Sequence, residues 1–146
     1  MPDAVKAQLL AEAVARALFE RDAAAQGLGI VIAEVRPGFA RLTMTVRPDM
    51  LNGHQTCHGG FSFALADTAF AYACNARNHA TVAAGCNIVY PAAGRLGDVL
   101  TAVAEERHLQ GRSGLYDVTV TTQTGTVIAL FRGQSRRVEG KIIAEP

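Results

Sequence analysis

The segment from Gly59 to Ala76, GGFSFALADTAFAYACNA, restricts the possible folds of this chain more than any other. It is rich in Ala, Phe and Leu, and Asp67 is its only acidic residue. A helix that is apolar on nearly every side is buried in a folded protein. The rest of the chain is apolar enough to cover it, because 49% of the 146 residues are hydrophobic and 18% are charged. We therefore predict a central helix enclosed by the other elements.

A second helix and a hairpin are predicted before this central helix. Residues 4–20 are rich in Ala, Leu, Glu and Arg, with the apolar side chains at helical spacing. Residues 29–35 are β-rich, and residues 39–47 alternate apolar and polar side chains as a strand with one wet face does. The Arg-Pro-Gly sequence at 36–38 is typical of a turn, so the two segments are expected to pair as a hairpin.

Four strand-like segments follow the central helix, and breaks that contain glycine separate them, the second break being Gln110 to Gly114. The segments are 80–90, 98–108, 115–122 and 126–138. Consecutive strands without helices between them favour an antiparallel sheet. The predicted fold class is therefore α+β, with a long central helix wrapped by an antiparallel sheet and an extra N-terminal helix. The chain contains no repeat, low-complexity tract or linker, so one domain spanning 1–146 is expected.

Charge and cysteine content narrow the possible partners and location. The net charge of +1 argues against a nucleic-acid-binding protein, which usually has a marked basic excess. The first residues, MPDAVKAQLLAEAVARALFERD, carry charges at short intervals, so neither a secretory signal nor a membrane span is expected. The three cysteines, Cys57, Cys74 and Cys86, are widely spaced and form no CxxC pair. These features predict a cytoplasmic protein.

A zinc site is considered and not expected. His54 and His58 stand four residues apart, a spacing that suits a metal ion only on a helix. Asn52-Gly53 just before them is typical of a turn. The glutamate of an HExxH motif is also replaced by Gln55.

Asp67 is the candidate catalytic side chain. A carboxylate inside an apolar helix is unfavourable unless it is paired or hydrogen-bonded, so it has either a structural partner in a loop or a chemical role. His58-Gly59-Gly60 stands where the helix begins. The first N–H groups of a helix have no partner within it, and glycine lets a ligand approach them closely. Such a helix start can hold a developing oxyanion.

Gly59 and Asp67 are too far apart to act together within one chain. Eight residues of helix separate them, or about 12 Å at ~1.5 Å per residue. A reacting carbonyl has to lie roughly 3 Å from both its nucleophile and its oxyanion donor. Two such helices packed antiparallel about a two-fold axis would bring Asp67 of one chain to Gly59 of the other. The hypothesis therefore predicts an obligate dimer with two composite sites.

The stretch LNGHQTCHGGFSFALADTAFAYACN, from Leu51 to Asn75, resembles the hotdog-fold thioesterases of the phenylacetate-degradation (PaaI-like) type. The resemblance extends from about Ala17 to Val138 and includes the combination of Asn52, His58-Gly59-Gly60 and Asp67. It implies a central helix wrapped by an antiparallel sheet and two chains joined in one continuous sheet, commonly as a tetramer made of two dimers. It also implies hydrolysis of acyl-CoA, with phenylacetyl-CoA or its ring-hydroxylated forms as substrates, without a metal or an organic cofactor.

The resemblance also implies roles for individual residues. Asp67 would attack the thioester carbonyl or activate a water, and the backbone N–H of Gly59 would polarise that carbonyl. His58 would orient the loop or the thioester, and Asn52 would hydrogen-bond near the reacting atoms. Contacts with the substrate are expected from the following residues: Gly60, Thr68, Arg132 and Arg136. The two arginines are candidates for the phosphates of coenzyme A, with a protective basic edge strand as the alternative.

One departure from the family pattern concerns the hydrolytic water. Some relatives place a Ser or Thr one turn after the acid or on the following strand, whereas this chain has Ala71, Ala83 and Ala84 there. Thr68, beside the acid, is the substitute that the sequence offers. Two other functions remain open: a hotdog lyase such as an enoyl-CoA hydratase or dehydratase, and a non-catalytic acyl-CoA-binding protein. A lyase usually has a different Asp/His pairing, and a sensor is expected to lose the acid of the helix.

Overall fold

The computed structural model describes residues 1–145. The helices are α1 (Asp3–Arg21), α2 (Ala23–Gly27) and α3 (Gly59–Asn75), with a 3-10 turn η1 (Pro48–Met50). The strands are β1 (Val31–Arg36), β2 (Phe39–Thr45), β3 (Thr81–Val89), β4 (Val99–Gln110), β5 (Ser113–Thr121) and β6 (Val127–Arg137).

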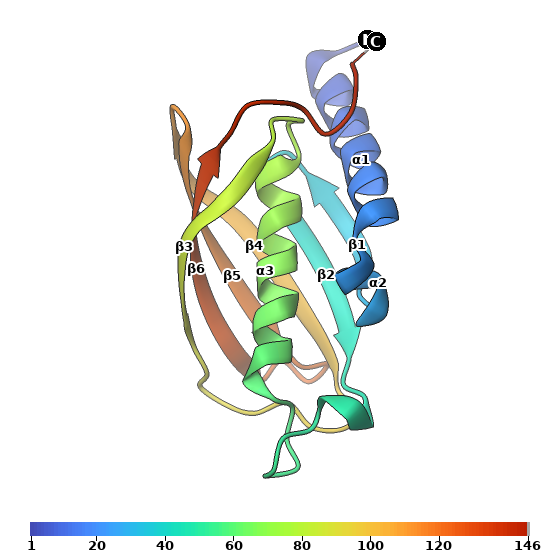
Figure 1. Cartoon of the computed structure of the whole chain (residues 1–146), viewed down its shortest axis with the longest axis vertical. Coiled ribbons are helices and arrows are strands. Elements are labelled where there is room, and N and C mark those ends of the chain that lie inside the picture. The colour runs from blue at the N-terminus through green and yellow to red at the C-terminus, as the bar shows by residue number, and fades with distance from the viewer. Residues whose placement is uncertain (146) are drawn as a thin grey trace.

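The six strands form one antiparallel sheet in the order β1-β2-β4-β5-β6-β3. The sheet curves around α3, which packs against all six strands, while α1 runs alongside β1 at one edge (Figure 1). The other edge is β3, which pairs only with β6 among the described strands. This arrangement confirms the predicted α+β fold, with its central helix and its additional N-terminal helix.

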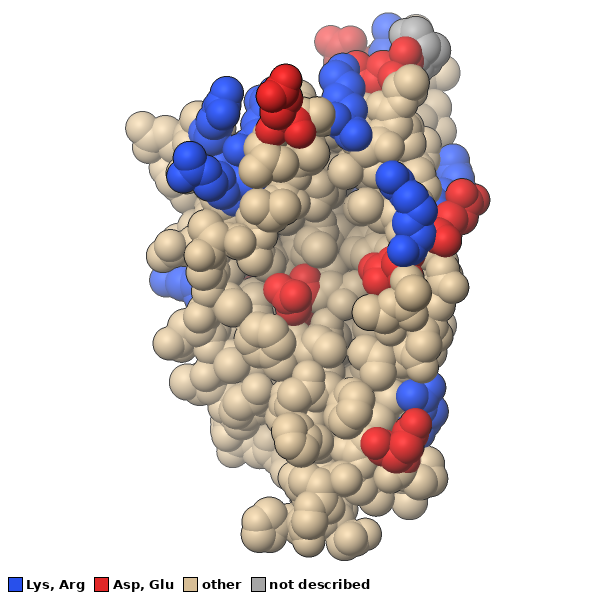
Figure 2. Space-filling model, viewed as in Figure 1, with Lys and Arg blue, Asp and Glu red and all other residues tan. Residues whose placement is uncertain are grey.

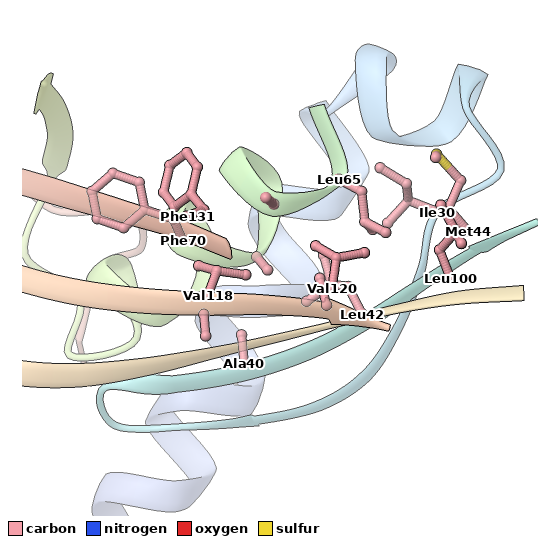
Figure 3. Close-up of a cluster of buried hydrophobic side chains, with 14 of the residues drawn as sticks. Ile30, Ala40, Leu42, Met44, Leu65, Phe70, Leu100, Val118, Val120 and Phe131 are labelled. Carbon is pink, nitrogen blue, oxygen red and sulfur yellow. The ribbon is translucent and has the colours of Figure 1, made fainter. Parts of the chain in front are cut away.

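The core lies between α3 and the concave face of the sheet. Leu65 and Phe70 of α3 point toward the sheet, where Leu42, Val118 and Val120 meet them (Figure 3). Alanines at 66, 69 and 73 are completely buried and let the helix lie close to the strands. Leu65, Phe70 and Val118 are each at most 1% exposed, so truncating any of them would remove a large buried apolar contact.

The predicted elements are confirmed within a few residues, with two differences. The short helix α2 and the turn η1 were not expected, and both are single turns held by local hydrogen bonds such as Ala25 N–H to the Asp22 carboxylate (3.0 Å). The break predicted at Gln110 to Gly114 is wrong, because both of these residues lie in paired strands. A two-residue turn suffices there, since Gly111 adopts a φ of 59° that reverses the chain tightly.

Burial of α3 differs from the expectation of a helix enclosed on all sides. The side of the helix that faces away from the sheet carries half-buried residues, among them Asp67, Thr68 and Ala71. The single sheet covers only one side of the helix, so this side stays open in the protomer. None of the helices within residues 1–145 is long and apolar enough to cross a membrane.

Candidate active site

The start of α3 is built around His58. Its backbone is extended (φ −60°, ψ 133°) and its Nδ1 accepts a hydrogen bond from the Gly60 N–H at 2.9 Å, so the side chain caps the helix. A ring nitrogen that accepts a hydrogen bond carries no proton, which places the proton of the neutral imidazole on Nε2. The exposed ring therefore has a free N–H donor beside the helix start.

Of the five consecutive backbone amides from residue 57 to residue 61, four have acceptors. Cys57 N–H donates to the Gly94 carbonyl and His58 N–H to the Met50 carbonyl, both at 2.8 Å. Gly60 N–H donates to the ring of His58, and Phe61 N–H to the carbonyl of His58 at 3.0 Å. Within residues 1–145, the N–H of Gly59 has no such acceptor. The Gly59 amide, at a half-exposed position, is thus the one without an acceptor, and it lies at the positive end of the helix dipole.

Asn52 shapes the loop that leads into this helix start. Its Oδ1 accepts hydrogen bonds from the N–H groups of His54 (2.9 Å) and Thr56 (3.2 Å), and its Nδ2 donates to Thr56 Oγ1 (3.1 Å). Its backbone N–H also bonds to the Thr56 carbonyl at 2.8 Å. The side chain that was expected to reach the reacting atoms is therefore largely engaged within its own loop.

Asp67 lies half-buried on the open side of α3 without a protein partner. No hydrogen bond or ion pair to its carboxylate is found within residues 1–145, and burial is the one cause that raises its pKa. Figure 2 shows one acidic group amid uncharged surface over α3, and α3 contains a single acidic residue, Asp67. A purely structural role for Asp67 would require a hydrogen-bond partner in a loop. The described residues supply no such partner.

The negative charge of Asp67 acts on the free edge of the sheet. After burial, the negative charge of Asp67 is the next cause that raises the pKa of Cys86 on β3. The same charge contributes, after burial, to the raised pKa of Cys74 about two helix turns further on. Asp67 does not line any of the three open grooves described for the protomer.

The neighbours of Asp67 offer one hydroxyl for a water molecule. Thr68 donates its own hydroxyl proton to the Ala64 carbonyl at 2.6 Å, so its oxygen is left as an acceptor. Ala71 is half-buried one turn further on, and Ala83 and Ala84 are exposed on β3. None of these three alanines provides a polar side-chain atom.

Arg132 and Arg136 lie on the convex face of the sheet, opposite α3. They alternate with the buried residues Phe131, Gly133 and Ser135, which confirms that they share a face. Arg132 is held by Asp117 through two hydrogen bonds of 2.7 and 2.9 Å. Arg136 lines an open groove of about 570 Å³ and has no acidic partner within residues 1–145.

His54 and His58 lie in a loop and at a helix cap, not on one face of a helix. Across the described part of the chain, no three His, Cys, Asp or Glu side chains gather as they would around a metal ion.

Two residues beyond β3 contact the helix start and were not singled out in the sequence. Tyr90 donates its hydroxyl proton to the Gly59 carbonyl at 3.0 Å, and Gly94 accepts the Cys57 N–H. Both are more than thirty residues away along the chain, so no local pattern could have linked them to Gly59. Only the pairing of β3 with β6 brings them to the start of α3.

A curved antiparallel sheet wrapped around one helix, with a capped helix start and an unpaired acid on that helix, defines a hotdog-fold protein. Residues 54–129 match the thioesterase superfamily, and the chain belongs to that family. It is 51% identical to the acyl-coenzyme A thioesterase PaaI of Escherichia coli over 131 residues. This alignment covers 90% of this chain and 94% of the E. coli protein. These findings confirm the resemblance seen in the sequence.

Solved structures of two similar proteins have the same fold. The structure of the E. coli PaaI protein from the phenylacetic acid degradation operon superposes with a TM-score of 0.91 at 49% identity, covering 92% of this chain and 97% of that one. A thioesterase protein from Streptococcus pneumoniae with coenzyme A superposes with a TM-score of 0.78 at 27% identity, covering 84% and 96% of the two chains.

The raised pKa of Asp67 predicts a pH-dependent effect on stability. Because burial lifts the folded pKa above the ordinary value of 3.8, the folded state binds this proton more tightly than the unfolded state does. The stabilisation is therefore complete below 3.8 and is lost as the pH rises through the folded pKa. Asp67→Asn, which never ionises, should gain stability relative to the wild type over this window. Denaturant unfolding of both proteins between about pH 3 and pH 8 measures the difference in their free energy of unfolding. A stability advantage of Asp67→Asn that shrinks as the pH rises would contradict the raised pKa of Asp67.

Proposed function

We propose that this protein is a cytoplasmic thioesterase that hydrolyses an aryl-acetyl-CoA, such as phenylacetyl-CoA or a ring-hydroxylated form, in phenylacetate degradation. One observation carries the proposal: α3 presents an unpaired amide at Gly59 and an unpaired carboxylate at Asp67. These are the two groups that acyl transfer needs, an oxyanion donor and a base or nucleophile. The PaaI relative, with its acyl-CoA activity, supports the choice of substrate.

The two groups are supplied by different chains. They lie about 12 Å apart along α3 at ~1.5 Å per residue, so one chain cannot place both beside one carbonyl. In the proposed dimer, Asp67 of one chain meets the helix start of its partner, and the two-fold axis repeats the site. The dimers would pair further into a tetramer.

The free edge of the sheet is the proposed dimer contact. None of the nine residues of β3 is buried in the protomer, and Val82 and Val89 are 49% and 52% exposed. An exposed apolar edge strand is a ready template for pairing with another strand. Pairing of β3 with its copy would join two sheets, and the charge of Asp67 acts on Cys86 of this edge strand.

Hydrolysis then follows one of two balanced routes. Asp67 either attacks the thioester carbon and forms an anhydride that water cleaves, or takes a proton from a water that attacks the same carbon. In both routes the carbonyl oxygen becomes an oxyanion held by the Gly59 N–H, and the C–S bond breaks to release coenzyme A as a thiolate. The proton lost by the attacking water then passes to the thiolate, from Asp67 or through solvent, and gives the thiol. A thiolate is a good leaving group, so no strong general acid is required.

Other residues complete the proposed site. The Nε2–H of His58 would donate to the substrate, and Thr68 would accept a hydrogen bond from the water. Gly60 leaves room for the capping His58 ring, which lies 3.1 Å from where a Cβ would stand, and so keeps the helix start close to the substrate. Asn52 supports the loop and has one Nδ2 hydrogen left for the reacting region.

Arg136 is a better candidate than Arg132 for a phosphate of coenzyme A. Both arginines line open grooves, but the charge of Arg132 is already balanced by Asp117, whereas Arg136 has no acidic partner within residues 1–145. Both lie on the face opposite α3, so such a contact requires the coenzyme to extend past the edge of the sheet.

Mixing two inactive variants tests the shared site. Asp67→Asn and Gly59→Pro each damage both sites of their own dimer. A mixed dimer has one intact site, which combines Asp67 of one chain with Gly59 of the other. Random exchange in an equal mixture makes about half of the dimers mixed, so about a quarter of the wild-type activity should return.

The measurement is thiol release from phenylacetyl-CoA after co-refolding, with each variant refolded alone as the control. An inactive mixture of folded dimers contradicts the composite site. Hydration of an enoyl-CoA without thiol release by the wild type would instead favour the lyase alternative, and binding of acyl-CoA without turnover would favour the sensor.

A further inference from the structure

We infer that Tyr90 is a positioning residue that fixes the direction of the Gly59 N–H. The inference rests on the proposed function, in which this amide holds the oxyanion. Tyr90 directly follows β3, and its hydroxyl donates to the Gly59 carbonyl oxygen at 3.0 Å.

The two peptide planes that meet at the Cα of Gly59 are both anchored. In the plane between residues 59 and 60, the carbonyl accepts from Tyr90 and the N–H donates to the His58 ring. In the plane between residues 58 and 59, the His58 carbonyl accepts from Phe61 N–H. The one free group of the two planes is the Gly59 N–H. Anchoring both planes restricts the backbone torsions of a glycine, which are freer than those of other residues.

The ring of Tyr90 also explains why residue 59 is a glycine. A Cβ at this position would lie 3.1 Å from Cζ and 3.3 Å from Cε1 of the ring, closer than side chains ordinarily pack. The aromatic ring thus occupies the space of the missing side chain and closes one side of the helix start. At the same time Tyr90 is 47% exposed, so the ring borders the surface where the proposed substrate lies.

Fixed direction matters because an oxyanion donor works by preorganisation. The donor has to lie within about 2.7–3.1 Å of the position that the oxyanion will occupy, without reorganising during the reaction. Without the Tyr90 bond, the peptide plane between residues 59 and 60 is held less firmly, so the torsions of Gly59, and with them the direction of its N–H, vary more. The consequence falls on the transition state more than on ground-state binding, so kcat should fall while KM stays nearly constant.

Tyr90→Phe tests this inference, since it removes the hydroxyl and keeps the ring. We expect kcat to fall about 3- to 10-fold, the range that the loss of one hydrogen bond covers. The factor should be the same for phenylacetyl-CoA and acetyl-CoA, because the amide acts on the carbonyl common to both. A direct contact between Tyr90 and the acyl group would instead give a factor that differs between the two substrates, and would overturn the inference.

Tyr72→Phe is the matched control. The Tyr72 hydroxyl donates to the Asp22 carboxylate at 3.1 Å, at the opposite end of α3 from Gly59. This variant should lower the thermal midpoint and leave kcat unchanged. If the wild type turns over and Asp67→Asn does not, but Tyr90→Phe keeps the wild-type kcat, the positioning role is wrong while the proposed function stands. If the wild type releases no thiol from any acyl-CoA, the proposed function itself fails.

Discussion

Replacing Asp67 by asparagine is expected to lower kcat for phenylacetyl-CoA by about a thousandfold or more, the upper range for a lost base or nucleophile. Asparagine keeps the size and shape of the side chain but neither attacks a carbonyl nor accepts a proton from water. Burial raises the pKa of the Asp67 carboxyl, which makes the ionised form a stronger base. The same shift predicts that kcat/KM of the wild type increases with pH as Asp67 ionises, and that the midpoint of this increase lies above pH 3.8.

Thiol release and a pH profile of kcat/KM measure these effects. Asp49, an exposed acid paired with Arg47 in the loop before α3, offers a control, because Asp49→Asn removes the same charge away from the helix. Folded Asp67→Asn with wild-type turnover would exclude the proposed role. Because the variant is also expected to be more stable than the wild type at neutral pH, loss of activity through unfolding can be separated from loss of chemistry.

Gly59→Pro is expected to lower kcat by about 100- to 1,000-fold, the loss measured when one oxyanion donor is removed. Proline has no N–H, so the substitution deletes the one amide in this region that has no acceptor within residues 1–145. The backbone at this position suits proline, and its Cβ meets the ring of Tyr90 at 3.1 Å just as that of alanine does. Gly59 is the first residue of α3, where proline is favoured, and the extended backbone of His58 is the conformation that a residue before proline adopts.

Gly59→Ala separates the effect of losing the N–H from the effect of adding side-chain atoms. Alanine carries a Cβ into the same 3.1 Å contact with Tyr90 but retains the amide hydrogen. Alanine should therefore have a moderate effect and proline a severe one, and both variants should keep the helical circular dichroism of the wild type. Equal kcat values for the two variants would mean that the amide is not the oxyanion donor.

Local chemistry made much of this site predictable from the sequence. An acid in an apolar helix is conspicuous because burial of its charge is unfavourable, and Asp67 does lie unpaired on α3. Glycines after a capping residue likewise mark a helix start, and His58-Gly59-Gly60 forms one. The strand segments could be located from alternation, but their lateral order could not, because each strand pairs through backbone groups that every residue shares.

The contacts made by polar side chains were less predictable. Asn52 was expected near the reacting atoms, but in the structure it holds the turn of its own loop, because its amide satisfies three nearby groups. Arg132 was a candidate for phosphate and is paired with Asp117 on the neighbouring strand. Such partners depend on strand register, which the sequence of one strand does not contain.

The sequence by itself determined the fold class, the central helix and the two groups on it that support a chemical role, because periodicity, capping and the cost of a buried charge are local properties. Tertiary structure alone decided that β3 forms the free edge of the sheet, that the charge of Asp67 acts on Cys86 of this edge and that Tyr90 hydrogen-bonds to Gly59. These features follow from contacts between residues far apart in the chain, whose geometry is set by how the whole sheet closes around α3.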